Sequence, residues 1–231
     1  MNWQTAHKIS KDTFSIGAGW EAKMEELFTV LIARSKEEEE LDSASLILLL
    51  SELDKIAQEE LNALEQSLVL AYNYSLNATL MELDDDVGYT IPSLALGYSK
   101  NWCTDGKTYD QRITDNIANT KNELRGLILG WQGDDPIVLM GLITDILTKA
   151  NNEWKRLIRT ELEAAFAQGS RDANLMKGAL YAVIENDSPC DEVCAEMVGE
   201  HEVSLHGRLG IDLPPYHPNC QCVFLGLFGQ N

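Results

Sequence analysis

The segment Pro214-Pro215-Tyr216-His217-Pro218-Asn219-Cys220-Gln221-Cys222, here called the closing segment, organises the C-terminal part of the chain. It places one histidine and two cysteines between His217 and Cys222, among prolines that restrict the backbone. Cys190 and Cys194 come shortly before it, so four of the five cysteines lie beyond residue 189. We therefore expect a small module in this region that is held together by its thiol and imidazole groups.

Hydrophobic periodicity predicts that most of the chain before this module is helical. Apolar residues recur at intervals of three and four over residues 19–86, 109–128 and 137–173. Asp134-Asp135-Pro136 has the form of a helix start, with acidic residues at the positive end of the helix dipole and proline in the first turn. The apolar run 179–184 predicts a short buried strand, which a turn-rich segment follows. The expected fold class is mainly α, of the α+β type, with long N-terminal and central helices and a small turn-rich C-terminal α/β module.

A connecting segment separates the first helical region from the second. Residues 84–106 contain three consecutive aspartates followed by scattered glycine and proline, which is typical of a loop. We therefore predict two domains. Residues 1–106 form a helical N-terminal region with its connecting loop, and residues 107–231 form a C-terminal domain.

Composition limits the classes of partner. An apolar fraction of 45% and a charged fraction of 24% are those of a soluble globular protein. The net charge of −19 does not support direct binding to nucleic acid, and it favours basic protein partners. The apolar run 46–50 is too short to span a membrane, and residues 1–20 lack the apolar core of a signal peptide. We expect synthesis in the cytosol and no membrane partner.

Cys190, Cys194, His217, Cys220 and Cys222 are the candidate metal ligands. Structural Zn²⁺ sites use four thiolate or imidazole groups in a tetrahedron, and five are present here. Cys190 and Cys194 would share one face of a helix, whereas Cys220 and Cys222 would share one side of an extended segment. Two other interpretations stay open. The thiols can be buried or joined in a disulfide, or one can act as a catalytic nucleophile with His217 as its base.

The sequence gives no positive sign of an enzyme. It contains no phosphate-binding loop, no dinucleotide-binding fingerprint and no nucleophile elbow. We therefore expect a non-enzymatic protein without catalytic residues, whose one cofactor would be structural Zn²⁺. The alternatives are a zinc-stabilised hydrolase that uses Glu185, Asp187 or a histidine, and a cytosolic adaptor whose acidic surface binds a basic partner.

Three features follow one another in a fixed order: Arg159-Thr160-Glu161 on a long helix, Asp187 with Cys190 and Cys194, and then the closing segment. Together they resemble the phage Mu F-like minor head protein family, which comprises head morphogenesis proteins of tailed phages and prophages. That family's motif runs from an Arg-Thr-Glu helix through Asp-x-x-Cys-x-x-Cys to Pro-Pro-x-His-Pro-x-Cys-Arg-Cys.

The resemblance covers roughly residues 109–225, with two departures from the motif. Three residues instead of two separate Cys190 from Cys194, and Gln221 stands where the family usually has arginine.

The resemblance implies a minor head (capsid) protein that acts in head morphogenesis near the portal, with a structural and non-catalytic role. It implies portal, capsid or scaffold proteins as partners, assembly in the host cytoplasm, and a place in the virion at the head interior or portal vertex. It also makes residues 107–231 the Mu F-like head morphogenesis domain. Within that domain, Arg159 and Glu161 are candidates for tying the long helix to the closing segment.

Overall fold

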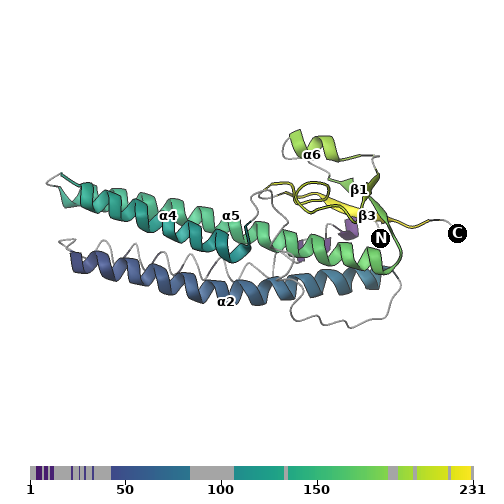
Figure 1. Ribbon diagram of the computed structural model, residues 1–231, viewed down its shortest axis with the longest axis horizontal. Helices are drawn as coiled ribbons and strands as arrows, with labels where there is room; N and C mark the ends of the chain where they lie inside the picture. Colours follow the sequence, from purple (N-terminus) through teal and green to yellow (C-terminus); the bar gives the residue numbers. More distant parts are fainter. Residues whose placement is uncertain are drawn as a thin grey trace. The chain divides into compact units, whose positions relative to one another are not determined.

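The fold combines long helices with a small sheet. The structure, a computed structural model, describes residues 4–6, 8–9, 11–12, 22, 26, 29, 33, 43–83, 107–132, 135–186, 192–199, 202–217 and 220–229. Its main elements are α2 (Ser43–Glu82), α4 (Tyr109–Gly130), α5 (Pro136–Met176), β1 (Tyr181–Glu185), α6 (Glu192–Met197), β2 (Glu202–Ser204) and β3 (Val223–Leu227) (Figure 1). The described residues are mostly helical, with a three-stranded antiparallel sheet, so the predicted mainly α, α+β class is confirmed.

The helix boundaries follow local signals in the sequence. At the start of α5, Asp135 accepts a hydrogen bond at its Oδ1 atom from the backbone N–H of Ile137, at 2.9 Å, which satisfies a free amide of the first turn. The helix then continues without a break to Met176. Gly178 follows with a φ of 86°, a conformation that glycine adopts without strain at a helix end. The predicted helix start is confirmed, and the helical segment predicted over 137–173 forms one continuous helix.

Part of one predicted segment and the whole of another cannot be compared with the structure. Of the predicted helical region 19–86, residues 43–82 form α2, while most of 19–42 lies outside the described residues. The predicted connecting loop 84–106 also lies outside them. No helix within the described ranges is long and apolar enough to cross a membrane.

The chain divides into two compact units. The helical unit consists of residues 19–64 and 110–157, and the mixed unit consists of residues 1–18, 65–109 and 158–231. Helices α2 and α5 each contribute residues to both units. Both units combine segments from either side of residue 107, the predicted start of the C-terminal domain. The division into two domains at that residue stays a prediction.

In the helical unit, segments of α2, α4 and α5 surround an apolar core. Ion pairs link neighbouring helices at its surface: Lys121 of α4 contacts Asp54 of α2 at 2.6 Å, and Lys149 of α5 contacts Glu123 of α4 at 3.0 Å. Such exposed pairs each contribute up to about 1 kcal/mol, so burial of apolar side chains is the main stabilising term. The fully buried side chains include Leu53, Ile113, Leu124, Ile143 and Trp154.

In the mixed unit, the second halves of α2 and α5 approach each other closely. A Cβ atom added at Gly169 of α5 would collide with the carbonyl oxygen of Tyr72 and would lie 3.0 Å from the backbone nitrogen of Leu76. At the same crossing, the hydroxyl of Ser75 donates a hydrogen bond to the carbonyl of Phe166 at 2.8 Å. Every residue of α5 from 161 to 170 is buried, so this part of the helix lies inside the unit.

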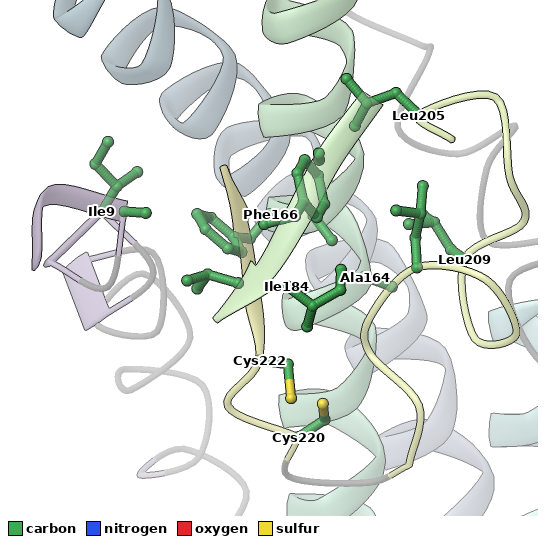
Figure 2. Packing of buried hydrophobic residues seen from close by; sticks show 14 of the residues in the cluster. Ile9, Ala164, Phe166, Ile184, Leu205, Leu209, Cys220 and Cys222 are labelled. Carbon is green, nitrogen blue, oxygen red and sulfur yellow. The ribbon is translucent and has the colours of Figure 1, made fainter. Parts of the chain in front are cut away.

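The sheet of the mixed unit has the strand order β2-β1-β3, and both pairings are antiparallel. Strand β1 confirms the short strand predicted over 179–184, whereas β2 and β3 form within the segment predicted to be rich in turns. The sheet packs on α5, and Gly226 of β3 lies so close to Asn174 that a Cβ atom there would collide with the amide. The buried cluster around Phe166, Ile184 and Leu205 also takes in the thiols of the closing segment (Figure 2).

We predict that Gly169→Ala destabilises the protein by about 1–3 kcal/mol, because the added methyl group meets backbone atoms that cannot move separately from α2. Chemical denaturation measures this change in the free energy of unfolding. Gly141→Ala is the matched control in the same helix, since nothing lies within 4 Å of its Cβ position. It should stabilise by about 0.5–1 kcal/mol through helix propensity. Equal effects of the two substitutions would contradict the close helix crossing.

Candidate metal centre

Two short elements bring a thiol and an imidazole together in the mixed unit. Cys194 lies in α6, which follows β1, and the backbone N–H of Gly199 returns to bond the carbonyl of Ile184 at 3.2 Å. The closing segment approaches from the other side, where the backbone N–H of Cys220 donates to the carbonyl of His217 at 3.2 Å. The segment directly after α6 and the end of the closing segment are therefore both tied to β1, since β3 begins directly after the closing segment and pairs with β1.

Cys194, His217 and Cys220 form a cluster, here called the thiol–imidazole cluster. The Sγ atom of Cys194 lies 2.9 Å from Nε2 of His217 and 3.7 Å from Sγ of Cys220. Their potential ligand atoms all lie within 4.8 Å of one another. Both cysteines are fully buried, while His217 is half-buried. This group could hold a metal ion.

The distances can be compared with those of a tetrahedral site. Zn–S bonds of about 2.3 Å and Zn–N bonds of about 2.0 Å place two sulfurs about 3.8 Å apart, and sulfur and nitrogen about 3.5 Å apart. The sulfurs of Cys194 and Cys220 match this spacing at 3.7 Å. The contact of Cys194 with His217 is shorter, at 2.9 Å, and is that of a hydrogen bond between thiol and imidazole. The contact of Cys194 with His217 would therefore have to lengthen for both groups to bind one zinc ion.

The same distances bear on the disulfide interpretation. A disulfide joins its sulfurs at about 2.05 Å, well below the 3.7 Å between Cys194 and Cys220. Cys222 is also a free, buried thiol in this structure. The cysteines that the structure describes are thus free, buried thiols, and the formation of a disulfide between them stays a prediction.

Neighbouring thiols affect one another's ionisation. Hydrogen bonding from Cys222 lowers the pKa of Cys220 to about 6, against an ordinary value of 9.0, and this outweighs the opposing effect of burial. The same hydrogen bond, together with burial, raises the pKa of Cys222. Burial and the nearby cysteines also raise the pKa of Tyr216. The cluster therefore favours one thiolate, which is the form of cysteine that binds metals.

The other predicted site residues are placed as follows. Cys222 lies beside the cluster but outside the group whose ligand atoms are all within 4.8 Å of one another. Its Sγ accepts a hydrogen bond from Nδ2 of Asn186 at 3.3 Å. Cys190 and Asp187 lie outside the described residues. Sequence reasoning did not identify Asn186, which lies two positions after the end of the predicted strand.

The Arg-Thr-Glu signature lies on α5, as predicted, with Thr160 and Glu161 buried and Arg159 exposed. The relative exposure of Glu161 is only 1%, which is unusual for a carboxylate, so this side chain does not lie on the solvent-exposed face of α5. The suggested link from Arg159 and Glu161 to the closing segment stays a prediction.

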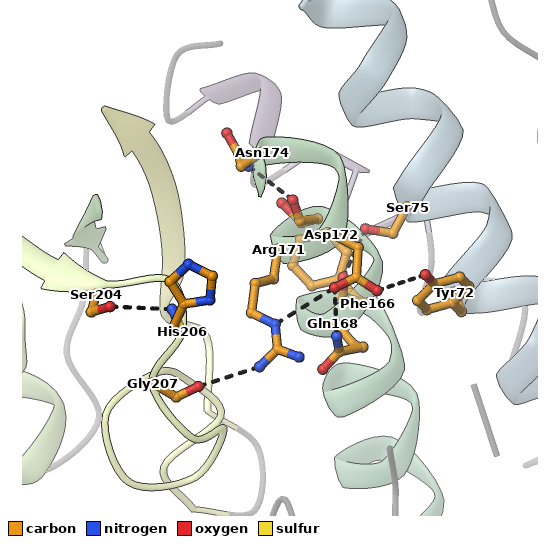
Figure 3. A network of polar contacts seen from close by, with 11 residues as sticks. Tyr72, Ser75, Phe166, Gln168, Arg171, Asp172, Asn174, Ser204, His206 and Gly207 are labelled. Atoms are coloured by element: carbon orange, nitrogen blue, oxygen red, sulfur yellow. Dashed lines mark hydrogen bonds and ion pairs between the residues drawn. The ribbon is translucent and has the colours of Figure 1, made fainter. Parts of the chain in front are cut away.

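A polar network that the sequence did not predict holds the mixed unit together (Figure 3). Asp172 of α5 accepts hydrogen bonds from the hydroxyl of Tyr72 in α2 and from Nε2 of Gln168, both at 2.7 Å. The neighbouring Arg171 pairs with Asp172 at 3.7 Å and donates to the carbonyl of Gly207 at 3.3 Å. The network thus connects α2 and α5 to the loop after β2.

Comparison of the chain with known protein families, with curated proteins and with solved structures gave no match. Fold and site together define a mainly helical α+β protein with a buried thiol–imidazole cluster in a small C-terminal module.

We predict that the metal-free protein gains one thiolate with an apparent pKa of about 6, because hydrogen bonding from Cys222 stabilises the anion of Cys220. A pH titration followed by the ultraviolet absorbance of thiolates measures it. Folding lowers this pKa, so ionisation of Cys220 stabilises the folded state as pH rises from about 6 toward 9.0, and this contribution is lost as pH falls through 6. Persistence of the low-pH phase in Cys220→Ser would contradict the assignment.

Proposed function

We propose that this chain is a minor head protein of a tailed phage or prophage that acts in head morphogenesis near the portal. The closing segment, with its resemblance to the Mu F-like family, is the observation that carries the proposal. The contact of Cys194 with His217 and Cys220 supports it, because the family motif includes both segments and here they meet in one cluster.

A structural role without catalysis suits the character of the cluster. Catalytic zinc sites keep one position open for water or substrate, whereas structural sites are closed and rich in cysteine. Cys194 and Cys220 are both fully buried and belong to the same apolar cluster as Phe166 and Ile184. This setting favours a structural site over that of a zinc-dependent hydrolase.

Zn²⁺ is the ion that this donor set fits best, since thiolate and imidazole ligands together are typical of zinc sites. In this proposal, the ion would be held by Cys194, His217 and Cys220 with a fourth ligand. It would join α6 to the closing segment. A cross-link of this kind matters most in a small module, whose own core supplies little stability.

The proposed partners are the portal protein and capsid or scaffold proteins. The net charge of −19 favours basic protein surfaces and gives no support to direct DNA binding. Exposed apolar side chains in the helical unit provide area for such a contact, among them Ile47, Leu48, Leu129 and Ile137. The protein would be assembled in the host cytoplasm and would lie in the head interior or at the portal vertex.

We predict that protein purified under reducing conditions contains about one Zn²⁺ per chain, because one cluster of this type forms one tetrahedral site. Elemental analysis by mass spectrometry measures the metal. Cys220→Ser should lose it, and Cys103→Ser, which removes the thiol that is distant in sequence from the others, should retain it. Zinc far below one per chain, or loss in both variants alike, would contradict the zinc assignment.

We predict that the chain co-purifies with the portal protein encoded near its own gene. The two are co-expressed, the portal protein is tagged, and the amount of chain retained is measured against the same experiment with an unrelated tagged protein. Retention by the portal protein alone is the expected result. An absence of portal and large terminase genes from the neighbourhood, with metabolic genes in their place, would contradict the head role and favour a hydrolase or an adaptor.

A further inference from the structure

The position of Cys222 is determined by the sheet. The register of β1 with β3 pairs Glu185 with Val223, so the next opposed positions in this antiparallel ladder are Asn186 and Cys222. The Nδ2 atom of Asn186 indeed donates a hydrogen bond to Sγ of Cys222, at 3.3 Å. Cys222 is also buried, with 4% relative exposure. Its thiol is therefore held at one place by a main-chain register and by a side-chain donor.

This thiol faces the thiol–imidazole cluster. Figure 2 shows the sulfurs of Cys220 and Cys222 turned toward one another at the end of the closing segment. The cluster itself supplies two sulfurs and one nitrogen, whereas a closed structural zinc site needs a fourth ligand.

We propose that Cys222 is the fourth ligand of a closed site with three cysteines and one histidine, and that Asn186 is a positioning residue that stabilises the Cys222 thiolate. This inference rests on the zinc site proposed above. An N–H group directed at a ligand sulfur orients the ligand and stabilises its negative charge, as hydrogen-bond donors to metal-bound side chains do at other metal sites.

Closing the site requires shifts of side chains, because Cys222 lies outside the group whose ligand atoms are all within 4.8 Å of one another, and because Cys194 lies too close to His217. The ring of His217 is half-buried, whereas the three sulfurs are buried, so it has the most room to move. Its contact with Cys194, at 2.9 Å, is also shorter than the roughly 3.5 Å expected between sulfur and nitrogen on one zinc ion. Moving the imidazole away from Cys194 would make room for the ion between the four groups.

Cobalt(II) is a suitable probe, because its visible bands report tetrahedral geometry and its near-ultraviolet charge-transfer absorbance scales with the number of bound thiolates. The full chain, freed of metal under reducing conditions, is titrated with Co²⁺ and then displaced with Zn²⁺. Cys222→Ser should lose about a third of the charge-transfer absorbance, as expected for two thiolates in place of three. Cys190→Ser is the matched control and should retain the full absorbance.

Asn186→Ala tests the positioning role separately, with all four ligands left in place. It should weaken Zn²⁺ binding by about 10–100-fold and shift the charge-transfer band to lower energy, because the sulfur loses its hydrogen bond. Unchanged affinity and band position would remove Asn186 from the proposal. Far-ultraviolet circular dichroism verifies that each variant keeps its helices.

The reverse pattern, in which Cys190→Ser loses the absorbance and Cys222→Ser keeps it, would overturn the assignment of Cys222. It would also be overturned if the unaltered protein bound Co²⁺ tetrahedrally but with a charge-transfer absorbance that corresponds to only two thiolates. Neither outcome depends on the portal protein, so capture by the portal protein tests the head role independently. A complete failure to bind Co²⁺ or Zn²⁺ would overturn both metal proposals and leave the portal experiment to decide the function.

Discussion

Five residue pairs join β1 to β3, and the geometry of the cluster depends on them. The ladder anchors the chain directly after Cys222, so the preceding residues of the closing segment must pass close to the end of β1. The segment that leaves β1 leads to α6 and Cys194. One antiparallel pairing therefore brings together thiols that are 26 residues apart in sequence.

Within the mixed unit, the sheet packs on α5, whose own position is fixed by its contact with α2. Helix α5 is buried on all sides from residue 161 to 170, and its close crossing with α2 at Gly169 leaves no room for a side chain. The network around Asp172 then joins both helices to the loop after β2. Strand β2 is followed by this loop, and β3 follows the closing segment. Because both strands pair with β1, the position of β1 is constrained from both sides.

The sequence was most informative where the determining interactions are local. Helix α5 could be predicted because its apolar stripe, the capping Asp135 and the terminal Gly178 all act within a few residues. Strand β3 could not be predicted in this way, because its short apolar run forms a strand only through pairing with β1, about forty residues earlier in the chain.

The same distinction applies to the site. The joint presence of Cys194, His217 and Cys220 followed from their residue types and clustering, but the donor Asn186 depends on the register of a ladder that was not foreseen. The bond from Tyr72 to Asp172 spans 100 positions and has no local signal at all. The burial of Glu161 likewise results from tertiary packing, since a glutamate is rarely buried without such packing.

The strand order β2-β1-β3 also has a consequence for the order of events during synthesis. The central strand is made first, and both of its partners leave the ribosome later. Helix α5 can form as it emerges, because its hydrogen bonds are local, but β1 has no neighbour until β2 arrives and no second neighbour until β3 is complete. Among the described thiols, Cys194 is therefore the first to appear, and it waits without its sulfur partners while the rest of the module is translated. The cluster of Cys194 with His217 and Cys220 can therefore form only after these later residues have been made.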